Sequence, residues 1–242
     1  MGDDAMVVAG NSDWTLDHLK GMVQVIEQTT YTADSAGEIG EMDSCCIGFE
    51  TFNEQGYAVK YEDKDRDGRL TMEMVMTLTA SGKFESATRS EGGVQVWKRK
   101  VTYDADGKVL FAVDTDSSGA VTRYSSKISE NEFGQVLGGE IHTGDSIFIG
   151  VWTRKYIDGI EAGRAWTDSL GVETYNSNGE LNKDGLLYTM NIVEIVEDVS
   201  TTKIETYVYD NFDETGNWTQ RTIYGESQLA IKVEKRVYTY FE

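Results

Sequence analysis

The sequence predicts an all-β fold, a long antiparallel meander of sequential hairpins that forms a twisted open sheet or a partial barrel. The first observation behind this prediction is a regular glycine spacing, in two interleaved series with steps of 25 to 27 residues. A turn therefore falls on average every 12 or 13 residues, and repeats of this kind indicate one hairpin after another. The first series is Gly56, Gly82, Gly107, Gly134, Gly159 and Gly185, and the second is Gly68, Gly93, Gly119, Gly144 and Gly171.

The second observation is the composition of the short segments that contain these glycines. They are polar, and the chain contains no proline, so Gly, Asn, Asp and Ser must supply the turn conformations. Asp or Asn before Gly, between alternating residues, is a strong hairpin signal. About 14 to 16 strands of about 8–10 residues fit this pattern. The predicted turns are 53–56, 65–68, 79–82, 104–107, 116–119, 176–179 and 213–217.

The third observation is the alternation of apolar and polar residues between the turns. Segment 70–79 alternates clearly, which is typical of a half-buried strand, and 229–241 does the same. Segments 146–156 and 186–196 are apolar on both faces, which indicates packing on both sides. The predicted buried face of the first of these strands consists of Leu70, Met72, Met74, Met76 and Leu78.

One short helix is predicted before the strands, over residues 12–21. Ser12 can cap its N-terminus, Leu16 and Leu19 share a face, and Gly21 can end it. From residue 22 onward the period of the apolar residues changes to two.

Residues 1–242 are expected to form one β-repeat domain. Regular hairpin repeats occupy 22–171, and because the spacing loosens afterwards, 172–242 is expected to form a C-terminal lobe of the same sheet. A β-propeller is the alternative, with two hairpins in each blade. Four similar blades cannot be aligned in this sequence, so the meander is preferred.

Composition limits the partners of this protein. Hydrophobic residues make up 39% of the chain and aromatic residues 11%, a mixture that suits highly exposed sheets. The chain has 22 basic and 42 acidic residues, a formal net charge of −20. Such a surface repels phosphate backbones and anionic lipid. We therefore expect no nucleic acid partner, no membrane insertion of this segment, and no cofactor apart from a possible divalent cation.

Two adjacent cysteines, Cys45 and Cys46, are the only ones in the sequence. Because a disulfide between neighbours is strained, free or buried thiols are expected, and the redox compartment stays open. Residues 1–10 have neither a basic region nor a long apolar core, so they do not predict a signal peptide.

Several predicted turns carry an aromatic residue four positions before the glycine. The clearest examples are YDADGKV at 103–109 and YDNFDETGNWTQRTIY at 209–224. These segments resemble the tyrosine–aspartate (YD, Rhs-type) repeats of bacterial surface and secreted proteins, and LKGMVQVIEQTTY at 19–31 is similar to the opening of Bacteroidetes-type secreted proteins or lipoproteins. The resemblance implies a continuous antiparallel sheet, a periplasmic or cell-surface location, and no active site. The aromatic residues are Phe52, Tyr103, Tyr175 and Phe212.

Two acidic turns are candidate calcium sites. Asp63, Asp65 and Asp67 alternate before a glycine, and carboxylates in this pattern can curl around Ca²⁺. Asp114 and Asp116 form a poorer copy 51 residues further on, which a regular meander places at the same edge of the sheet. The alternative is two plain acidic turns, in which Asp accepts hydrogen bonds from its own backbone.

No catalytic residue is assigned from the sequence. Gly144-Asp145-Ser146 resembles the nucleophile segment of one group of esterases, but no histidine follows residue 142, and the serine needs a base. His18 and His142 are the only histidines, and neither has a neighbour at metal-ligand spacing. Both are interpreted as structural or exposed.

Three functions remain open at this point. The first is a non-catalytic binding or scaffold module of the bacterial cell envelope, with an unknown protein or glycan ligand. The second is a calcium-dependent adhesion or carbohydrate-binding module, based on the acidic turns. The third is a hydrolase with a carboxylate pair. Exposed aromatic residues could stack on sugar rings or peptides, or hold neighbouring strands together. These residues are Trp97, Trp152, Trp166, Trp218, Tyr207, Tyr209, Tyr238 and Tyr240.

Overall fold

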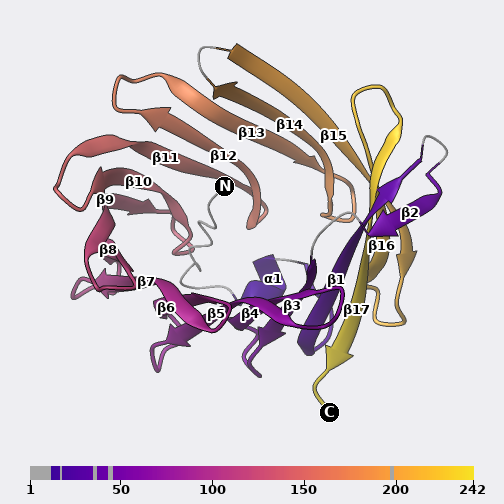
Figure 1. The fold of residues 1–242 in the computed structure, drawn as a ribbon, viewed down its shortest axis with the longest axis horizontal. Helices are drawn as coiled ribbons and strands as arrows, with labels where there is room; N and C mark the ends of the chain where they lie inside the picture. Colours follow the sequence, from indigo (N-terminus) through magenta and orange to yellow (C-terminus); the bar gives the residue numbers. More distant parts are fainter. Residues whose placement is uncertain (1–11, 17, 35–36, 43–45, 197–198) are drawn as a thin grey trace.

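The computed structural model describes residues 12–16, 18–34, 37–42, 46–196 and 199–242, and its strands form a closed antiparallel β-barrel (Figure 1). Sixteen of the described strands, β1 and β3 to β17, follow one another around the ring in chain order. The strands are β1 (Val23–Ala33), β2 (Ile39–Met42), β3 (Cys46–Phe52), β4 (Ala58–Asp65), β5 (Leu70–Leu78), β6 (Phe84–Glu91), β7 (Val94–Tyr103), β8 (Val109–Asp116), β9 (Val121–Glu130), β10 (Val136–Thr143), β11 (Phe148–Ile157), β12 (Ile160–Asp168), β13 (Glu173–Leu181), β14 (Leu187–Val196), β15 (Val199–Phe212), β16 (Trp218–Tyr224) and β17 (Ala230–Tyr240).

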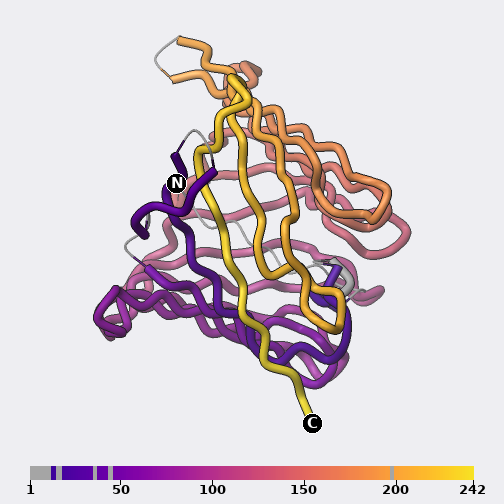
Figure 2. Tube along the Cα trace, turned by 90° about the vertical axis from the view of Figure 1, so that its right-hand side faces the viewer, coloured from indigo at the N-terminus to yellow at the C-terminus, as the bar shows by residue number. Residues whose placement is uncertain are grey.

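The two ends of the chain close the barrel. Strand β1 pairs with β3 on one side and with β17 on the other, in a register that runs from Val23↔Tyr240 to Thr32↔Lys232. Figure 2 shows the two terminal strands side by side along the wall. The predicted antiparallel meander is therefore confirmed, the propeller alternative is wrong, and the closure that the sequence left open is established. The short strand β2 pairs with β1 beside the ring.

The predicted N-terminal helix is much shorter than residues 12–21. Helix α1 covers Asp13–Leu16 and lies inside the ring (Figure 1). His18 has a φ of 55°, a left-handed conformation that stops helical hydrogen bonding. The segment is held by tertiary contacts: the Asp13 carboxylate accepts a 2.6 Å hydrogen bond from the Ala58 amide, and the Trp14 indole donates to the Val23 carbonyl at 2.8 Å.

The turns use the chemistry that the sequence predicts. In the β3–β4 turn, the Asn53 side chain accepts hydrogen bonds from the amides of Gln55 and Tyr57, both at 3.0 Å. Asp104 accepts from Asp106 and Lys108 in the same positions of the β7–β8 turn. Glycine at the end of such a turn has positive φ, for example 82° at Gly56. A side chain there would also meet the Trp14 ring at 2.5 Å, so this glycine is needed both for the turn and for seating α1.

Two local predictions are corrected. Residues 176–179 lie inside β13 and form no turn. A Cβ at Gly179 would meet the Leu187 side chain at 2.6 Å and the Ala162 carbonyl oxygen at 3.0 Å, so this glycine permits close packing of three strands instead. Cys46 is disulfide-bonded, so the expectation of free thiols is wrong for this residue, and Cys45 lies outside the described residues.

Four tyrosines repeat one hydrogen bond around the barrel. In each case the phenol donates to the backbone carbonyl of the first residue of the preceding strand, at 2.6 to 3.3 Å. Burial raises the pKa of the Tyr103 phenol to about 12, so these groups remain donors at neutral pH. Tyr103 and Tyr209 begin the two clearest YD-like segments. The motif therefore has a physical role: its tyrosine links two neighbouring strands through a side-chain hydrogen bond. The pairs are Tyr103–Phe84, Tyr156–Val136, Tyr209–Leu187 and Tyr238–Trp218.

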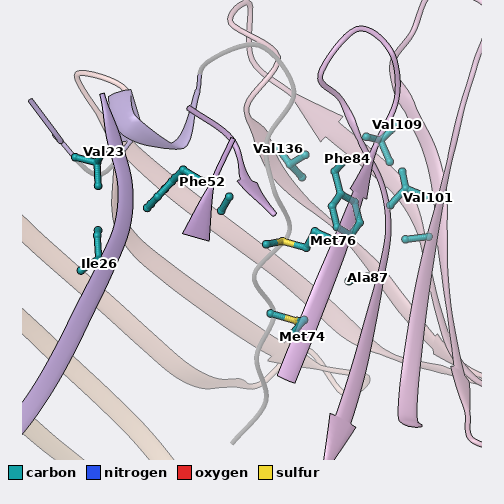
Figure 3. Close-up of a cluster of buried hydrophobic side chains, with 12 residues drawn as sticks. Val23, Ile26, Phe52, Met74, Met76, Phe84, Ala87, Val101, Val109 and Val136 are labelled. Atoms are coloured by element: carbon teal, nitrogen blue, oxygen red, sulfur yellow. The ribbon is translucent and has the colours of Figure 1, made fainter. Parts of the chain in front are cut away.

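The apolar core lies on the inner wall of the first half of the barrel, next to α1. Met74 and Met76 of β5 are buried, as the alternation predicts, whereas Val75 between them is exposed. Figure 3 shows the core side chains directed from several strands into one shared space. Trp14 and Leu19 pack against this core. Its members are Val23, Ile26, Phe52, Ala58, Met74, Met76, Phe84, Ala87, Val101, Val109, Ala112 and Val136.

The outer wall of the same strands is charged. Lys60 of β4 forms ion pairs with Glu62 at 3.1 Å and with Glu73 of β5 at 3.3 Å. Lys98 and Lys100 of β7 are exposed and alternate with the inward-facing Arg99. Because side chains alternate between the two faces of a strand, these lysines lie on the outside, together with exposed Val75 and Phe111, while the core lies on the inside.

Candidate ligand-binding site in the barrel lumen

The inner wall of β11, β12 and β13 carries a row of three aromatic rings. Trp152 pairs directly with Trp166 on the next strand, and Trp166 pairs directly with Tyr175 on the strand after that. Directly paired residues share one face of a sheet, and neighbouring strands lie about 4.8 Å apart. The three rings therefore form an aromatic row that spans about 10 Å across the wall.

A second row lies two residues further along the same strands and is cationic. Arg154 pairs directly with Arg164, and Arg164 pairs with Ser177. Like charges in directly opposite positions repel one another. Glu161 reduces this repulsion, because its carboxylate contacts both guanidinium groups, with Arg154 Nη1 3.3 Å from Oε2 and Arg164 Nε on Oε1. Arg154 also lies 5.3 Å from the centre of the Trp152 ring.

A third arginine, Arg123 of β9, approaches the same region and shares a carboxylate with another guanidinium. Asp114 accepts two hydrogen bonds from buried Arg99, at 2.7 and 2.9 Å, and one from Arg123 at 3.0 Å. Burial opposes ionisation of Asp114, but the hydrogen bonds from Arg99 and the charges of both arginines outweigh it and lower the pKa of the carboxyl group. Asp114 is therefore an anion that holds two cations in place.

These side chains surround a hollow of about 570 Å³. Its lining comes from β9, β11, β12, β13 and β14, and a hollow shared by strands so far apart along a curved sheet lies on the concave side, which is the lumen. The volume falls within the range of about 300–1,000 Å³ that is typical of ligand pockets. The inward-facing lining residues are Arg123, Trp152, Arg154, Arg164, Trp166, Tyr175 and Glu194.

The described lining of this hollow is rich in basic side chains. It contains three arginines and one glutamate, with Asp114, Glu161 and Arg99 behind them. The complete chain has a formal charge of −20. Of the nine arginines in the sequence, seven lie on inward-facing strand positions and two, Arg66 and Arg69, in the β4–β5 turn.

A second, smaller hollow of about 350 Å³ lies on the opposite part of the inner wall, between β17 and β5. Glu50, Tyr61 and Asp63 contribute to its lining, and Arg236 donates a 2.8 Å hydrogen bond to Gln28 there. Glu50 and Asp63 lie on adjacent strands at diagonal positions, because Glu50 pairs with Tyr61 and Gly48 pairs with Asp63.

An arginine between the two hollows is enclosed by aromatic rings. Arg221 of β16 lies 4.9 Å from the Tyr207 ring and 4.7 Å from the Trp218 ring, and Glu234 accepts its hydrogen bond at 2.6 Å. Burial and the hydrogen bond to Glu205 raise the pKa of the Tyr207 phenol. The aromatic residues predicted from the sequence thus lie mainly on the inner wall, several of them with arginine partners.

The structure distributes the predicted calcium ligands over different environments. Asp63 lines the second hollow, and Asp65 accepts hydrogen bonds from the amides of Asp67 and Arg69, both at 2.9 Å. Asp114 belongs to the arginine cluster, whereas Asp116 accepts from Ser118 and Ala120 in its own turn. Among the residues with defined positions, no three His, Cys, Asp or Glu side chains are grouped to hold a metal ion. Calcium binding by these turns stays a prediction.

His142 lies against aromatic rings on the outer wall. Its ring stacks on Tyr124 with centres 4.7 Å apart and meets Phe148 edge-on at 5.5 Å. Glu140 Oε2 lies 3.9 Å from His142 Nε2. Ser146 has a φ of 67° in the β10–β11 turn, and its environment is that of a hairpin turn. His18 lines a small hollow near Gly216 and Trp218.

The arginine row is a feature of the candidate site that the sequence analysis does not identify. A sequence signal for it exists: Trp and Arg are two residues apart in WTR at 152–154 and, in reverse order, in RAW at 164–166. Antiparallel pairing of these segments places Trp opposite Trp and Arg opposite Arg. Once the β11–β12 turn is placed between these two segments, their antiparallel pairing predicts both the aromatic row and the arginine row.

The fold resembles that of a bacterial porin-like protein. The similar structure is described as a porin-like protein from Bacteroides uniformis, with 12% identity, a TM-score of 0.57, and coverage of 90% of this chain and 96% of that chain. Partial similarity extends to a TcdB2-TccC3-Cdc42 structure, with 13% identity, a TM-score of 0.37, and coverage of 86% of this chain but 11% of that one. The TcdB2-TccC3 structure without its hypervariable C-terminal region matches with 11% identity, a TM-score of 0.20, and coverage of 84% and 15%.

No protein-family model matches this sequence, and no curated protein does either. The similarity to the porin-like protein therefore concerns the closed barrel of sequential hairpins. In the part of the chain that has defined coordinates, no helix is both long and apolar enough to cross a membrane.

Proposed function

We propose that this protein is a non-catalytic binding module of the bacterial cell envelope whose ligand, a glycan or a peptide, enters the barrel lumen. The observation that carries this proposal is the 570 Å³ hollow, in which an aromatic row and an arginine row lie side by side. Aromatic faces supply large contact areas, and guanidinium groups recognise carboxylates with fixed geometry. Together the two rows are suited to binding a ligand.

The outer wall supports a barrel surrounded by water. A membrane-spanning barrel presents an apolar outer band about 25 Å tall. Here the outer wall of β4 and β5 carries the Lys60 ion pairs with Glu62 and Glu73, and basic residues at the lipid midplane cost about 2–4 kcal/mol each. The porin-like description of the similar structure would suggest a membrane pore for this chain as well, but the charged outer wall favours a module without membrane insertion.

Two observations support an extracytoplasmic location. The closed hairpin barrel is shared with the porin-like protein of Bacteroides uniformis. Cys46 is disulfide-bonded, and disulfides persist mainly in oxidising compartments such as the periplasm and the cell surface. The YD-like segments add to this interpretation, because they resemble the repeats of bacterial surface proteins. Their tyrosines, Tyr103 and Tyr209, each donate a hydrogen bond to a carbonyl of the preceding strand.

The proposal is tested by presenting the protein with a panel of soluble envelope glycans and peptides. A bound ligand raises the thermal midpoint, and intrinsic tryptophan fluorescence reports on the lumen. We expect Trp166→Ala to abolish binding. The control Phe111→Ala removes an exposed aromatic residue from an outward-facing position of β8. This variant should bind the ligand as wild type does. Binding that survives Trp166→Ala, or ion conductance in a lipid bilayer without any ligand, would overturn the proposal.

A hydrolase with a carboxylate pair is the second candidate, and the second hollow favours it. Glu50 and Asp63 lie at diagonal positions on adjacent strands there, and diagonal neighbours are about 7–8 Å apart. A glycosidase needs two carboxyl groups at about 5–9.5 Å. Release of reducing ends from the glycan panel that is lost in Glu50→Gln, but unchanged in Trp166→Ala, would establish this activity.

A further inference from the structure

We infer that one end of the barrel, where the odd-numbered strands from β5 to β17 begin, is a docking surface for a partner polypeptide with apolar and basic side chains. This inference goes beyond the proposed binding function, because it concerns the rim of the barrel and not its lumen. Three features lead to it: apolar residues at the strand starts, their unequal exposure at the two ends, and acidic side chains around the exposed end.

The strand starts form an apolar ring at each end of the barrel. From β4 onward the strands are antiparallel neighbours in chain order, so even-numbered strands begin at one end and odd-numbered strands at the other. Consecutive starts at the same end are two strands apart, or about 10 Å. The two rings therefore come from the same hairpin repeat and differ only in what surrounds them.

The ring formed by the even-numbered strands is buried. Phe84, Val109 and Val136 begin β6, β8 and β10 and are 1% to 8% exposed. Their side chains are directed into the space of the apolar core (Figure 3). At this end, the strand starts therefore stabilise the fold. The buried members of this ring are Ala58, Phe84, Val109, Val136 and Trp218.

A polypeptide segment covers this buried ring. Trp14 and Leu19 of the N-terminal segment pack against the core. The segment is held at two turns of the same end: the Trp14 amide donates to the Gly56 carbonyl at 3.2 Å, and the Lys20 amide donates to the Asn217 side chain at 2.7 Å. Asn217 donates back to the Lys20 carbonyl at 2.8 Å. The chain itself thus shows how such a ring is covered.

The ring formed by the odd-numbered strands is exposed. Val94 begins β7 and is 64% exposed, whereas Phe84 begins the neighbouring strand β6 and is 1% exposed. The turns at this end add Ile147 and Leu170, of which Leu170 is 85% exposed. Repeated exposure of apolar side chains around one rim is typical of an interaction site. We call this end the exposed rim; its strand starts include Leu70, Val94, Val121, Phe148 and Val199.

Acidic side chains around the exposed rim select the partner. Asp116 ends β8 and accepts amides of its own turn, while Asp145 and Glu226 are exposed in the β10–β11 and β16–β17 turns. Among the described residues of the turns at this end from β4 onward, the basic ones are Arg66 and Arg69 in the β4–β5 turn. An acidic rim repels anionic lipid and a second copy of itself, and it attracts a basic partner. Together with the polypeptide cover of the other ring, this favours a basic, apolar polypeptide.

The experiment compares two synthetic peptides by calorimetry: one of leucine and lysine at helical spacing, and one with serine in place of every leucine. We expect wild type to bind the leucine peptide at least about tenfold more tightly, because apolar side chains are buried. The triple variant Val94→Ser, Val121→Ser, Leu170→Ser should lose most of this advantage and keep the thermal midpoint, since all three residues are exposed. Glu226→Gln should weaken both peptides at low salt and less at high salt.

The matched control is Phe133→Ser, which removes a 61% exposed side chain from the β9–β10 turn at the opposite end. This variant should bind the leucine peptide as wild type does. No binding of the leucine peptide, equal affinity for the two peptides, or an equal loss in Phe133→Ser would overturn the inference. Binding to phosphatidylcholine vesicles, or self-association, that the triple variant abolishes would also overturn it, because lipid or a second copy would then cover the exposed rim.

Discussion

The two halves of the barrel are built from the same hairpins but use their inner walls differently. Along β1 and β3 to β8 the larger part of the inner wall is apolar and filled, with Phe52 and Phe84 almost completely buried beside α1, next to the smaller hollow and the Arg99–Asp114 pair. Along β11 to β14 the inner wall is polar, aromatic and hollow, with Arg164 half exposed. The turn chemistry and the tyrosine bonds are nevertheless the same in both halves.

The difference teaches how one repeat serves two purposes. Hairpin formation depends on the turns and on main-chain pairing, which are alike around the ring, so the inward-facing residues are free to differ. Where those residues are Met, Phe and Val, they stabilise the fold. Where they are Trp and Arg, they line a hollow. Removing a side chain should therefore affect stability in the first half and binding in the second.

The largest effect on stability is expected for Phe84→Ala in the filled half. Phe84 is 1% exposed, and truncating a fully buried phenylalanine costs about 3–5 kcal/mol, because contacts are lost and a cavity remains. Trp166→Ala in the hollow half should cost less than about half of that, since the ring already borders open space. The free energies of unfolding from urea titration check both values. Equal losses for the two variants would remove the distinction between the halves.

The next effect concerns Asp114, at the boundary between the halves. Asp114→Asn removes the carboxylate that accepts two hydrogen bonds from buried Arg99, and breaking such a pair costs about 3 kcal/mol. The pKa of Asp114 is lowered in the folded protein. Its stabilising contribution is therefore complete above the unfolded pKa of about 3.9 and is lost as the pH falls through the lower folded value.

Unfolding experiments between pH 7 and pH 2 test this linkage. The difference between wild type and Asp114→Asn should be greatest at neutral pH and should shrink in the acid range. Asp67→Asn, which changes an exposed carboxylate in a turn, serves as the control and should follow the wild-type curve. A difference that stays constant down to pH 2 would show that the charge of Asp114 does not hold the cluster together.

The sequence predicts the hairpins well because their determinants are local. Asn53 and Asp104 each make their turn bonds within four residues, and the alternation around Met74 and Met76 decides which face is buried. Closure is not local, because β1 meets β17 only after the chain has completed the ring. Whether a long meander stays open or closes depends on tilt and register accumulated over all strands.

The site was harder to predict for a related reason. The sequence identifies Trp152 and Trp166 as strand aromatics, but their pairing depends on the register of β11 and β12, which shifts between Lys155 and Tyr156. A shift of one residue turns every side chain to the other face. Arginine carries no periodic signal of its own, so the inward placement of the strand arginines becomes visible only with the register known.

A smaller effect is expected to be equal in both halves. Tyr103→Phe in the first half and Tyr209→Phe in the second each remove one phenol hydrogen bond to a strand carbonyl, 2.6 and 2.9 Å long. Loss of one such bond costs about 1 kcal/mol. Chemical denaturation should give matching values for the two variants, because this contact belongs to the shared repeat. A loss confined to one variant would mean that the YD-like tyrosine is a local feature of that half.

The smallest effect concerns calcium at the β4–β5 turn of the filled half. If Asp63, Asp65 and Asp67 bind Ca²⁺ with the millimolar affinity of extracellular modules, 1 mM Ca²⁺ should stabilise the protein by about 0.5 kcal/mol. Asp65→Asn should abolish that gain, whereas Asp145→Asn in the β10–β11 turn should preserve it. The Asp65 carboxylate already accepts two turn amides, so the cation must use its remaining lone pairs. A calorimetric titration without heat at millimolar Ca²⁺ would rule out the calcium-dependent function and leave both halves of the barrel without a metal role.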